Sequence, residues 1–482
     1  MEINESQLEE LVQNIVKSVI AQTGAAVPAT QTRAASGNGT DKGDWGVFDS
    51  MNDAVEAAHE AFLQYGQRSA ECRKKITDAV RQMALDHKDE LARMTVEETG
   101  MGRIDHKTAK FVNAAKHSPG VDYLQPQAWS GKNGLALDEY SPFGVIGSIT
   151  PSTHPGPTMV NNIIIQMAGG NTIAFNPHPA AKRVNARVIQ LANQYMVEAG
   201  APKNCVTCVA EPTLDTAKTL FGHEKVQLLS VTGGPVMVDL AMTFPKKVIA
   251  AGPGNPPVLV DETADLALAA SEITMSASYD NNILCIAEKE IFVVDAVFDR
   301  FMAEMEKAGN RRLTREQMKE LGSKALTLSG RHWLIGREFA GRSARVLGKA
   351  IGLALPESVP MLFGETDRTD PWVIAEQMTC CIPVVRVRDF EDGLQASLKA
   401  EHGFKHTASI FSQDISRVTR FTRLLDCDVH VINGGTLRGN GGDLGEGYFS
   451  HTIATPTGEG ICTPLNFVRK KRIMTYKGFR FS

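Results

Sequence analysis

The chain has 482 residues, of which 43% are hydrophobic and 22% charged, and its formal net charge is −4. This length allows two domains of ordinary size, and the composition is close to the average of soluble globular proteins. The small negative charge gives no reason to expect nucleic acid or an acidic membrane as a partner. No apolar run in the sequence approaches the ~20 residues that a membrane-spanning helix needs.

The N-terminus is acidic and lacks the basic and apolar blocks of a secretory signal. The eight cysteines are scattered without regular spacing. We therefore expect free thiols in a reducing compartment, the cytoplasm.

Residues 1–20 are expected to form a short amphipathic helix, and residues 21–43, rich in Ala, Thr, Gly and Ser, a flexible linker. A tethered helix of this kind has to bury its apolar stripe against another surface. The stripe is aliphatic, is flanked by acidic residues and contains no Trp or Phe, which disfavours a membrane. We favour a docking helix for another protein over a helix that packs on the body of this chain. The stripe consists of Leu8, Leu11, Val12, Ile15, Val16 and Val19.

From Trp45 onward the pattern predicts continuous folded structure. Helices are predicted over residues 52–65, 73–87, 88–99, 159–167 and 182–199. Strands are predicted over residues 144–150, 171–176, 205–210 and 228–232. This alternation of strands and helices predicts an α/β fold with a parallel, doubly wound sheet.

A second α/β block is predicted from about Pro257. It contains strands over residues 290–294 and 381–387 and a helix over residues 296–306. The C-terminal segment 473–481 also has strand character.

Two residue pairs have the spacing of metal or redox sites. Cys205 and Cys208 lie on a predicted strand, where residues three apart point to opposite faces. His402 and His406 are four apart, but no third ligand converges on them. We therefore expect no metal.

Thr232, Gly233 and Gly234 end a predicted strand just before a helix, where backbone N–H groups can approach a phosphate. Alone the pattern is weak, because glycines at such turns also have purely steric roles. Cys285 follows the polar residues Asn281 and Asn282, which indicates a thiol at an element boundary. Considered by itself, Cys285 would still be interpreted as a buried structural thiol.

Several segments taken together change that interpretation. In their order along the chain they resemble the aldehyde dehydrogenase superfamily, and within it the CoA-acylating branch associated with bacterial microcompartments. The likeness extends from about Trp45 to the C-terminus. The segments that carry it are residues 142–147, 150–155, 168–179, 231–234, 252–257, 279–288, 376–387 and 458–464.

The resemblance implies that the Cys285 thiolate attacks an aldehyde to give a thiohemiacetal, and that hydride transfer to NAD leaves a thioester. The backbone N–H of Cys285 would be one donor to the oxyanion. The second donor in the wider superfamily is an asparagine. Here its place is held by Thr153, next to His154, so either side chain is a candidate.

The sequence departs from the hydrolytic members of the superfamily at Ala251, where those enzymes carry a glutamate that activates water. Hydrolysis of a thioester needs such a base, whereas a thiol is a good nucleophile without one. The missing carboxylate therefore favours coenzyme A as the acyl acceptor.

The resemblance also implies the cofactor site. Asn176 and Pro179 replace the lysine and glutamate that usually hold the adenosine ribose, which leaves NAD and NADP both open. Glu376 matches the glutamate that holds the nicotinamide ribose. The residues expected to bind the cofactor are Thr150, Pro151, Ser152, Asn176, Pro177, His178, Thr232, Gly233, Gly234, Ala251, Gly252 and Glu376.

The family architecture implies a Rossmann-type dinucleotide-binding domain over residues 44–122 and 143–256, and a catalytic domain over residues 257–455. Residues 123–142 and 456–482 would form a β extension for a homodimer or homotetramer. Residues 1–20 would bind a shell protein and place the enzyme inside a bacterial microcompartment.

The expected function is oxidation of propionaldehyde or acetaldehyde with NAD and coenzyme A to acyl-CoA and NADH, with a slight preference for propionaldehyde. One alternative is a hydrolytic dehydrogenase that gives the free acid. A second alternative is a non-catalytic structural protein of the shell.

Overall fold

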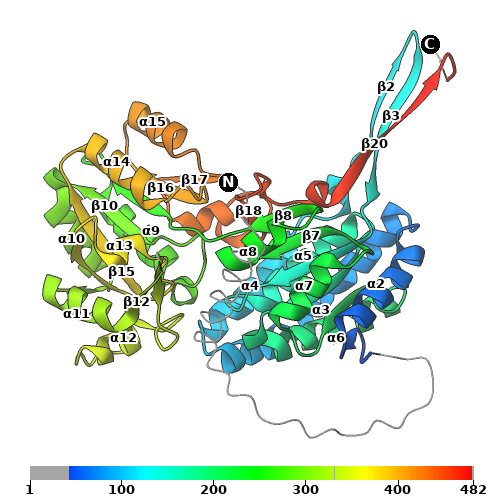
Figure 1. The fold of residues 1–482 in the computed structure, drawn as a ribbon. Helices are drawn as coiled ribbons and strands as arrows, with labels where there is room; N and C mark the ends of the chain where they lie inside the picture. Colours follow the sequence, from blue (N-terminus) through cyan, green and yellow to red (C-terminus); the bar gives the residue numbers. More distant parts are fainter. Residues whose placement is uncertain (1–42, 331, 480–482) are drawn as a thin grey trace, which may run out of the picture.

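The computed structural model describes residues 43–330 and 332–479. The predicted helix 1–20 and the linker up to residue 42 lie outside the described residues. The described chain forms two lobes, each built on a parallel sheet, and a narrow arm that projects from one of them (Figure 1). This arrangement confirms the predicted α/β fold.

The first lobe contains a six-stranded parallel sheet. In spatial order its strands are β1 (Val47–Phe48), β6 (Val206–Val209), β5 (Thr172–Pro177), β4 (Val145–Thr150), β7 (Val226–Thr232) and β8 (Lys247–Ala251). The helices of this lobe are α2 (Met51–Tyr65), α3 (Ala70–Thr99), α4 (Ile104–His117), α5 (Pro155–Ala168), α6 (Lys182–Glu198), α7 (Leu214–Gly222) and α8 (Pro235–Met242).

Helices cover both faces of this sheet, as a doubly wound fold requires. Along β5, Ile173 and Phe175 pack in one apolar cluster with α3, α5 and α6, whereas Ala174 packs in another with α2 and α7. Alternate residues of a strand point to opposite faces, so the two clusters lie on the two sides of the sheet. The strands β4 and β5 are buried along their whole length.

The two helices predicted over residues 73–87 and 88–99 are one continuous helix, α3. The prediction of a break was wrong, because the span contains no Gly or Pro that would end a helix. Ser69 begins α3 by accepting a hydrogen bond from the backbone N–H of Cys72 at 3.2 Å. Gly100 ends it in the left-handed region, with φ 69°.

The second lobe contains a seven-stranded parallel sheet. In spatial order its strands are β11 (Arg311–Leu313), β14 (Leu362–Thr366), β15 (Cys381–Val387), β10 (Glu290–Val294), β9 (Pro257–Val260), β16 (Thr407–Phe411) and β17 (Val429–Ile432). Its helices are α9 (Leu266–Ser278), α10 (Phe298–Lys307), α11 (Arg315–Ala325), α12 (Ala344–Ala350), α13 (Pro371–Ile374), α14 (Phe390–Ala400) and α15 (Ile415–Leu425), with a hairpin of β12 (Leu326–Ser329) and β13 (His332–Ile335).

The predicted strands 290–294 and 381–387 are confirmed as β10 and β15. The helix predicted over residues 296–306 begins later, at Phe298, because a 3₁₀ turn (Asp295–Val297) precedes it.

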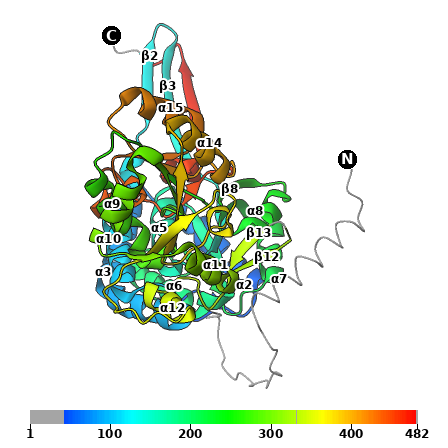
Figure 2. The ribbon, with the colours of Figure 1, turned by 90° about the vertical axis from the view of Figure 1, so that its left-hand side faces the viewer.

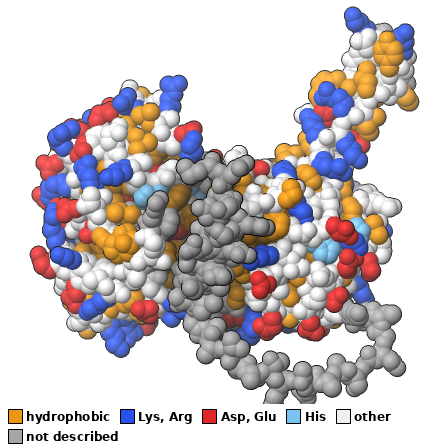
Figure 3. Space-filling model, viewed as in Figure 1, with side chains coloured by type: hydrophobic (Ala, Val, Ile, Leu, Met, Phe, Trp, Pro, Cys, Tyr) orange, Lys and Arg blue, Asp and Glu red, His pale blue; other side chains and the backbone are white. Residues whose placement is uncertain are grey.

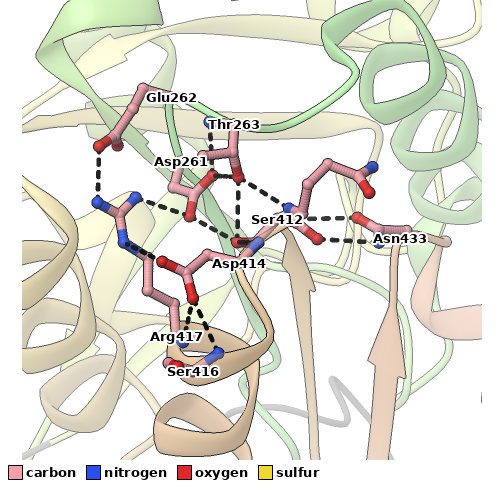
Figure 4. A network of polar contacts seen from close by, with 9 residues as sticks. Asp261, Glu262, Thr263, Ser412, Asp414, Ser416, Arg417 and Asn433 are labelled. Carbon is pink, nitrogen blue, oxygen red and sulfur yellow. Dashed lines mark hydrogen bonds and ion pairs between the residues drawn. The ribbon is translucent and has the colours of Figure 1, made fainter.

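A polar network closes the carboxyl ends of β9, β16 and β17 (Figure 4). Asp261 follows β9 and is fully buried. It accepts hydrogen bonds from Ser412 Oγ at 2.6 Å and from Arg417 Nη1 at 3.0 Å. Asn433 Nδ2 donates to the carbonyl of Ser412 at 3.0 Å. This end of the second sheet is thus occupied by the protein's own side chains.

The arm is an antiparallel sheet of β2 (Gln127–Gly131), β3 (Gly134–Pro142) and β20 (Val468–Tyr476), and it stands clear of both lobes (Figures 1 and 2). β20 begins and ends earlier than the predicted strand 473–481. Two short strands, β18 (Ile453–Ala454) and β19 (Gly460–Ile461), come before it. Cys462 and Phe467 pack in the core of the first lobe, so only the last part of the segment 456–482 lies in the arm.

Candidate active site

The predicted cofactor residues gather at one edge of the first sheet. The residues at 150–152, 176–178, 232–234 and 251–252 lie at the carboxyl ends of four neighbouring strands, β4, β5, β7 and β8. The register places Thr150 opposite Pro177 and Thr232 opposite Ala251. Four segments that are far apart in the sequence therefore meet at one edge.

This edge includes the point where the strand order reverses. From β4 the chain continues to β5 and β6 on one side, and then returns to β7 and β8 on the other. In open parallel sheets, ligands bind in the crevice outside the carboxyl ends at such a reversal. The crevice next to Thr150 and Thr232 is therefore the expected nucleotide site.

The turn after β7 fits a phosphate. Gly234 precedes the first residue of α8, and a Cβ at Gly234 would meet no heavy atom within 4 Å. The hydroxyl of Thr232 is buried and has no hydrogen-bond partner among the described residues. Open space at a helix N-terminus, next to an unpaired hydroxyl, suits an anionic group.

Two of the predicted cofactor side chains are bonded within the protein. Asn176 accepts a hydrogen bond from Thr216 Oγ1 at 2.6 Å. His178 Nδ1 accepts from the backbone N–H of Ala180 at 3.1 Å. Burial and the nearby Arg337 lower the pKa of His178. At this end of the crevice, contacts with a nucleotide would come from the backbone and Pro177 more than from these two side chains.

Cys285 follows a strained loop. The preceding 3₁₀ turn, Tyr279–Asn282, has Asp280, Asn281 and Asn282 in the left-handed region, with φ of 50°, 56° and 63°. Asp and Asn tolerate this conformation better than most residues, and runs of strained backbone concentrate at functional sites. Asn282 Nδ2 anchors the loop by donating to the carbonyl of Ala277 in α9 at 2.8 Å and to the carbonyl of Glu288, before β10, at 3.0 Å.

Lys289 also holds the loop in place. Its buried Nζ donates to Asn282 Oδ1 at 2.6 Å and to the carbonyl of Leu284 at 2.8 Å. The residue before Cys285 is therefore held directly by a buried cation.

Gly254 lies against Cys285. A Cβ at Gly254 would come within 2.5 Å of the Cys285 carbonyl oxygen. The Gly254 N–H donates to Glu376 Oε1 at 3.5 Å, which brings the predicted ribose ligand to the same place. Gly254 is three residues after Ala251, so the chain between the end of β8 and the residue that lies against Cys285 spans at most about 11 Å. The link 252–256 joins β8 of the first sheet to β9 of the second.

The environment of the Cys285 thiol holds both signs of charge. Burial and the carboxylate of Glu376 raise the pKa of Cys285 to about 12, while Lys289 and Lys110 lower it. The resting thiol is therefore protonated at neutral pH, and a base has to remove its proton.

His406 is a residue of this site that the sequence analysis missed. Its ring atoms lie 3.0 and 3.2 Å from the Cβ position of Gly254. The Nε2 atom is buried and has no partner among the described residues, and Nδ1 is 2.8 Å from Thr407 Oγ1. Burial and Lys289 lower the pKa of His406 to about 4, so the imidazole is neutral. By contrast, His402 is exposed, and its Nε2 is 3.0 Å from the carbonyl of Ile374.

The turn after β4 carries the two candidates for the second oxyanion donor. The carbonyl of Thr153 accepts a hydrogen bond from Lys107 Nζ. Lys107 also contacts Asp280, so its ammonium group connects the turn after β4 to the loop that precedes Cys285, called the cysteine loop below. The buried ring of His154 stacks on His451, with centroids 5.0 Å apart. Burial and the positive charges nearby lower the pKa of both histidines, which are neutral.

Ala251 ends β8 as a buried methyl group, 5% exposed. The side chain at this position is a methyl group, so it supplies no base.

Comparison with known proteins gives the family that the sequence segments resemble. The model of the "Aldehyde dehydrogenase family" matches residues 37–320. The chain is 39% identical to a propanal dehydrogenase (CoA-propanoylating) of Citrobacter freundii, over 99% of each chain. It is 43% identical to the acetaldehyde dehydrogenase (acetylating) EutE of Salmonella typhimurium, over 91% of this chain and 94% of the relative.

Two solved structures are similar. One is a propionaldehyde dehydrogenase from the fucose utilisation bacterial microcompartment of Clostridium phytofermentans, with a TM-score of 0.88 and 39% identity over 91% of this chain and all of that one. The other is a propionaldehyde dehydrogenase of Rhodopseudomonas palustris with bound CoA and an acylated cysteine, with a TM-score of 0.87 and 38% identity over 90% and 98% of the two chains.

Proposed function

This chain belongs to the aldehyde dehydrogenase family, and we propose that it oxidises a short-chain aldehyde to an acyl-CoA through a thioester on Cys285. The observation that carries the proposal is that Gly254 lies against Cys285 and donates a hydrogen bond to Glu376. Gly254 comes three residues after a strand that ends in Ala251 and contains no carboxylate.

Cys285 is the nucleophile in this proposal. The loop bonds of Asn282 and Lys289 hold the residue in place, and the neutral imidazole of His406 is in the protonation state that a general base needs. Removal of the Sγ proton gives the thiolate, whose attack on the aldehyde carbon forms a C–S bond and places the negative charge on the former carbonyl oxygen.

The oxyanion is stabilised by the backbone N–H of Cys285 and by a group from the turn after β4. We assign that second role to Thr153, which is half-buried, because the ring of His154 is buried against His451. The carbonyl then re-forms as the C–H bond breaks, and the hydride is transferred to the acceptor described next. The acyl group remains on Cys285 as a thioester.

The nicotinamide nucleotide, NAD, supplies the hydride acceptor when it is bound. The residues at the carboxyl-end crevice of the first sheet fit this group: Gly233 and Gly234 would hold its phosphates, and the half-buried Glu376 would hold the nicotinamide ribose. Gly254, three residues after Ala251, connects this edge of the sheet to Cys285.

The acyl acceptor is coenzyme A. Water is a poor nucleophile without a base, and the place where hydrolytic relatives carry that base is the methyl group of Ala251. A thiol ionises far more readily than water and attacks a thioester in a thiol exchange. The relatives named CoA-propanoylating and acetylating support this choice, and their two substrates support propionaldehyde or acetaldehyde as the aldehyde.

The test is a set of initial rates with C2 to C5 aldehydes, with and without coenzyme A, and with NAD or NADP. We expect acyl-CoA formation that depends on coenzyme A, and an acyl adduct on Cys285 detected by mass spectrometry when coenzyme A is left out. Full-rate NADH formation without coenzyme A would instead establish hydrolysis to the free acid. A Cys285→Ala variant with undiminished activity would refute the mechanism.

The arm supports association of subunits. Its exposed apolar side chains include Trp129, Ile473, Met474 and Tyr476, and they stand beside a run of basic residues (Figure 3). Apolar side chains on a thin projecting sheet have no core of their own to pack in, so a homodimer or homotetramer is the expected state. An Ile473→Lys, Met474→Lys double variant should lower the mass measured by light scattering; an unchanged mass would oppose this role.

Packaging in a microcompartment is the proposed location within the cytoplasm. The similar structure from a microcompartment of Clostridium phytofermentans supports it, together with the amphipathic pattern of residues 1–20. Deletion of residues 1–20 should leave the specific activity intact and abolish co-purification with shells. Unchanged co-purification would refute the docking role of this segment.

A further inference from the structure

Three buried charged side chains meet where helix α4 packs against the loop that precedes Cys285 (Tyr279–Asn282). Lys107 and Lys110 lie three residues apart on α4 and are 0% and 3% exposed, and Asp280 is 0% exposed. Both ammonium groups contact the same oxygen, Asp280 Oδ2, and the Lys107–Asp280 distance is 2.8 Å. The other carboxylate oxygen, Oδ1, accepts from the backbone N–H of Arg103 at 2.8 Å.

The charges of this cluster do not balance. Two ammonium groups share one carboxylate, which leaves one positive charge in a region without solvent access. Burial of an unbalanced charge is costly, so such charges are paired or drive a neighbouring group to ionise. Burial lowers the pKa of Lys110 to about 8. Burial by itself would raise the pKa of Asp280, but the two lysines hold it below its usual range.

Among the described residues, the other titratable groups around the cluster add no net negative charge, because the carboxylate of Asp105 is paired with Arg103 at 2.7 Å. His154 and His451 are neutral, and the neutral ring of His106 faces the backbone N–H of Asp280 through Nδ1, at 2.8 Å. The ring of Tyr279 lies 5.8 Å from Lys110 Nζ, and burial raises the pKa of this phenol.

Cys285 is the remaining group that can become an anion near Lys110. It is five residues after Asp280 on the same loop. On its other side stand Lys289 and Glu376, whose charges are opposite and offset each other. The excess positive charge of the cluster formed by Lys107, Lys110 and Asp280 is therefore the charge that a thiolate at Cys285 would balance.

We propose that Lys110 is a positioning residue whose buried positive charge balances the negative charge that forms at Cys285, first on the sulfur and then on the thiohemiacetal oxygen. Lys107 supports the same arrangement, because it contacts both the carbonyl of Thr153 and Asp280 and so fixes the turn after β4 relative to the cysteine loop. The inference rests on the proposed function in one respect, namely that Cys285 is the nucleophile.

The test follows the alkylation of Cys285 by iodoacetamide as a function of pH, in the full chain and without aldehyde, nucleotide or coenzyme A. The site of labelling is read by mass spectrometry, and Cys285→Ala gives the background from the other cysteines. A failure to form acyl-CoA would leave this measurement unaffected, so the two proposals can fail separately.

Lys110→Met removes a positive charge and should slow alkylation at a fixed neutral pH by about tenfold, which corresponds to a shift of about one pH unit in the profile. Lys110→Arg keeps the charge and should restore the profile to within about twofold of the wild type. Asp280→Asn removes the carboxylate, keeps a residue that accepts a left-handed backbone, and should shift the profile in the opposite direction, toward faster alkylation.

Opposite signs in the two variants are the result that a charge effect predicts and that loosening of the loop does not. Far-ultraviolet circular dichroism and urea unfolding identify any variant that fails to fold. If Lys110→Met folds and its alkylation profile matches the wild type, the proposal is overturned. If both substitutions slow alkylation to the same degree, the cluster is structural and the proposal is equally overturned.

Discussion

The carbonyl oxygen of Cys285 lies so close to Gly254 that a Cβ on Gly254 would come within 2.5 Å of it. Real Cβ atoms do not approach oxygen so closely, so Gly254→Ala has to displace the cysteine loop or the link between the sheets. We expect a loss of at least about 10²-fold in kcat/KM and an unfolding free energy lower by about 1–3 kcal/mol. Gly131→Ala on the arm, where a Cβ would meet nothing within 4 Å, is the matched control. Full activity in Gly254→Ala would show that the contact does not position Cys285.

His406 should govern the proton transfer at Cys285. The thiol is protonated at neutral pH because burial and Glu376 raise its pKa to about 12, so loss of the base should lower kcat by about 10²–10⁴-fold in His406→Gln. The pKa of His406 lies near 4, so the imidazole stays neutral above about pH 5 and should give no acid limb there. The variant should regain activity as the pH rises, because the thiolate fraction increases tenfold per unit below the thiol pKa. A flat profile in His406→Gln would argue against the assignment.

Ala251 should decide between the two acyl acceptors. Ala251→Glu places a carboxylate at the end of β8, three residues from Gly254, and we expect some of the thioester to be released as free acid without coenzyme A. Ala251→Gln has almost the same size and no basic oxygen, and it serves as the control. Product analysis by chromatography separates the acid from acyl-CoA. Equal amounts of acid from the two variants would mean that the position has no part in acceptor choice.

The network around Asp261 should affect stability and leave catalysis alone. Asp261 follows the carboxyl end of β9, whereas Gly254 and Cys285 precede the amino ends of β9 and β10, on the opposite side of the second sheet. Asp261→Ala removes the acceptor of Ser412 and Arg417 and should lower the unfolding free energy by about 2–4 kcal/mol, as measured in urea. The variant kept well below its unfolding midpoint should retain wild-type kcat. A change in kcat without a change in stability would contradict this division.

Much of the nucleotide edge could be predicted from the sequence. Each strand that carries it is a short apolar run followed by a turn, and parallel strands bring such turns to one edge. The residues at 150–152, 176–178 and 232–234 therefore meet at this edge, and their binding of the cofactor stays a prediction. Sequence patterns could not show that the amide of Asn176 is used by Thr216, since that contact depends on how the loop before α7 returns to the sheet.

The surroundings of Cys285, the proposed nucleophile, were harder to predict because they come from tertiary contacts. The ring of His406 lies next to Gly254, which in turn lies against Cys285, and nothing in the local sequence of His406 or Gly254 indicates this contact. Lys107 and Lys110 have the spacing of an ordinary exposed pair on a helix, and only the packing of α4 against the cysteine loop buries them. The break predicted inside α3 shows the opposite error, in which local pattern was given more weight than continuous helix propensity.

The arm imposes an order of events during synthesis. β20 pairs with β3 along its whole length, and the partners Asp138 and Arg472 are 334 residues apart in the chain. Until the last strand has been translated, β2 and β3 form only a two-stranded hairpin, which is marginally stable in water. Pairing over such a sequence separation is also slow to form. A growing chain therefore has an incomplete arm until β20 has been synthesised, and any encounter between subunits through the complete arm has to wait for that strand.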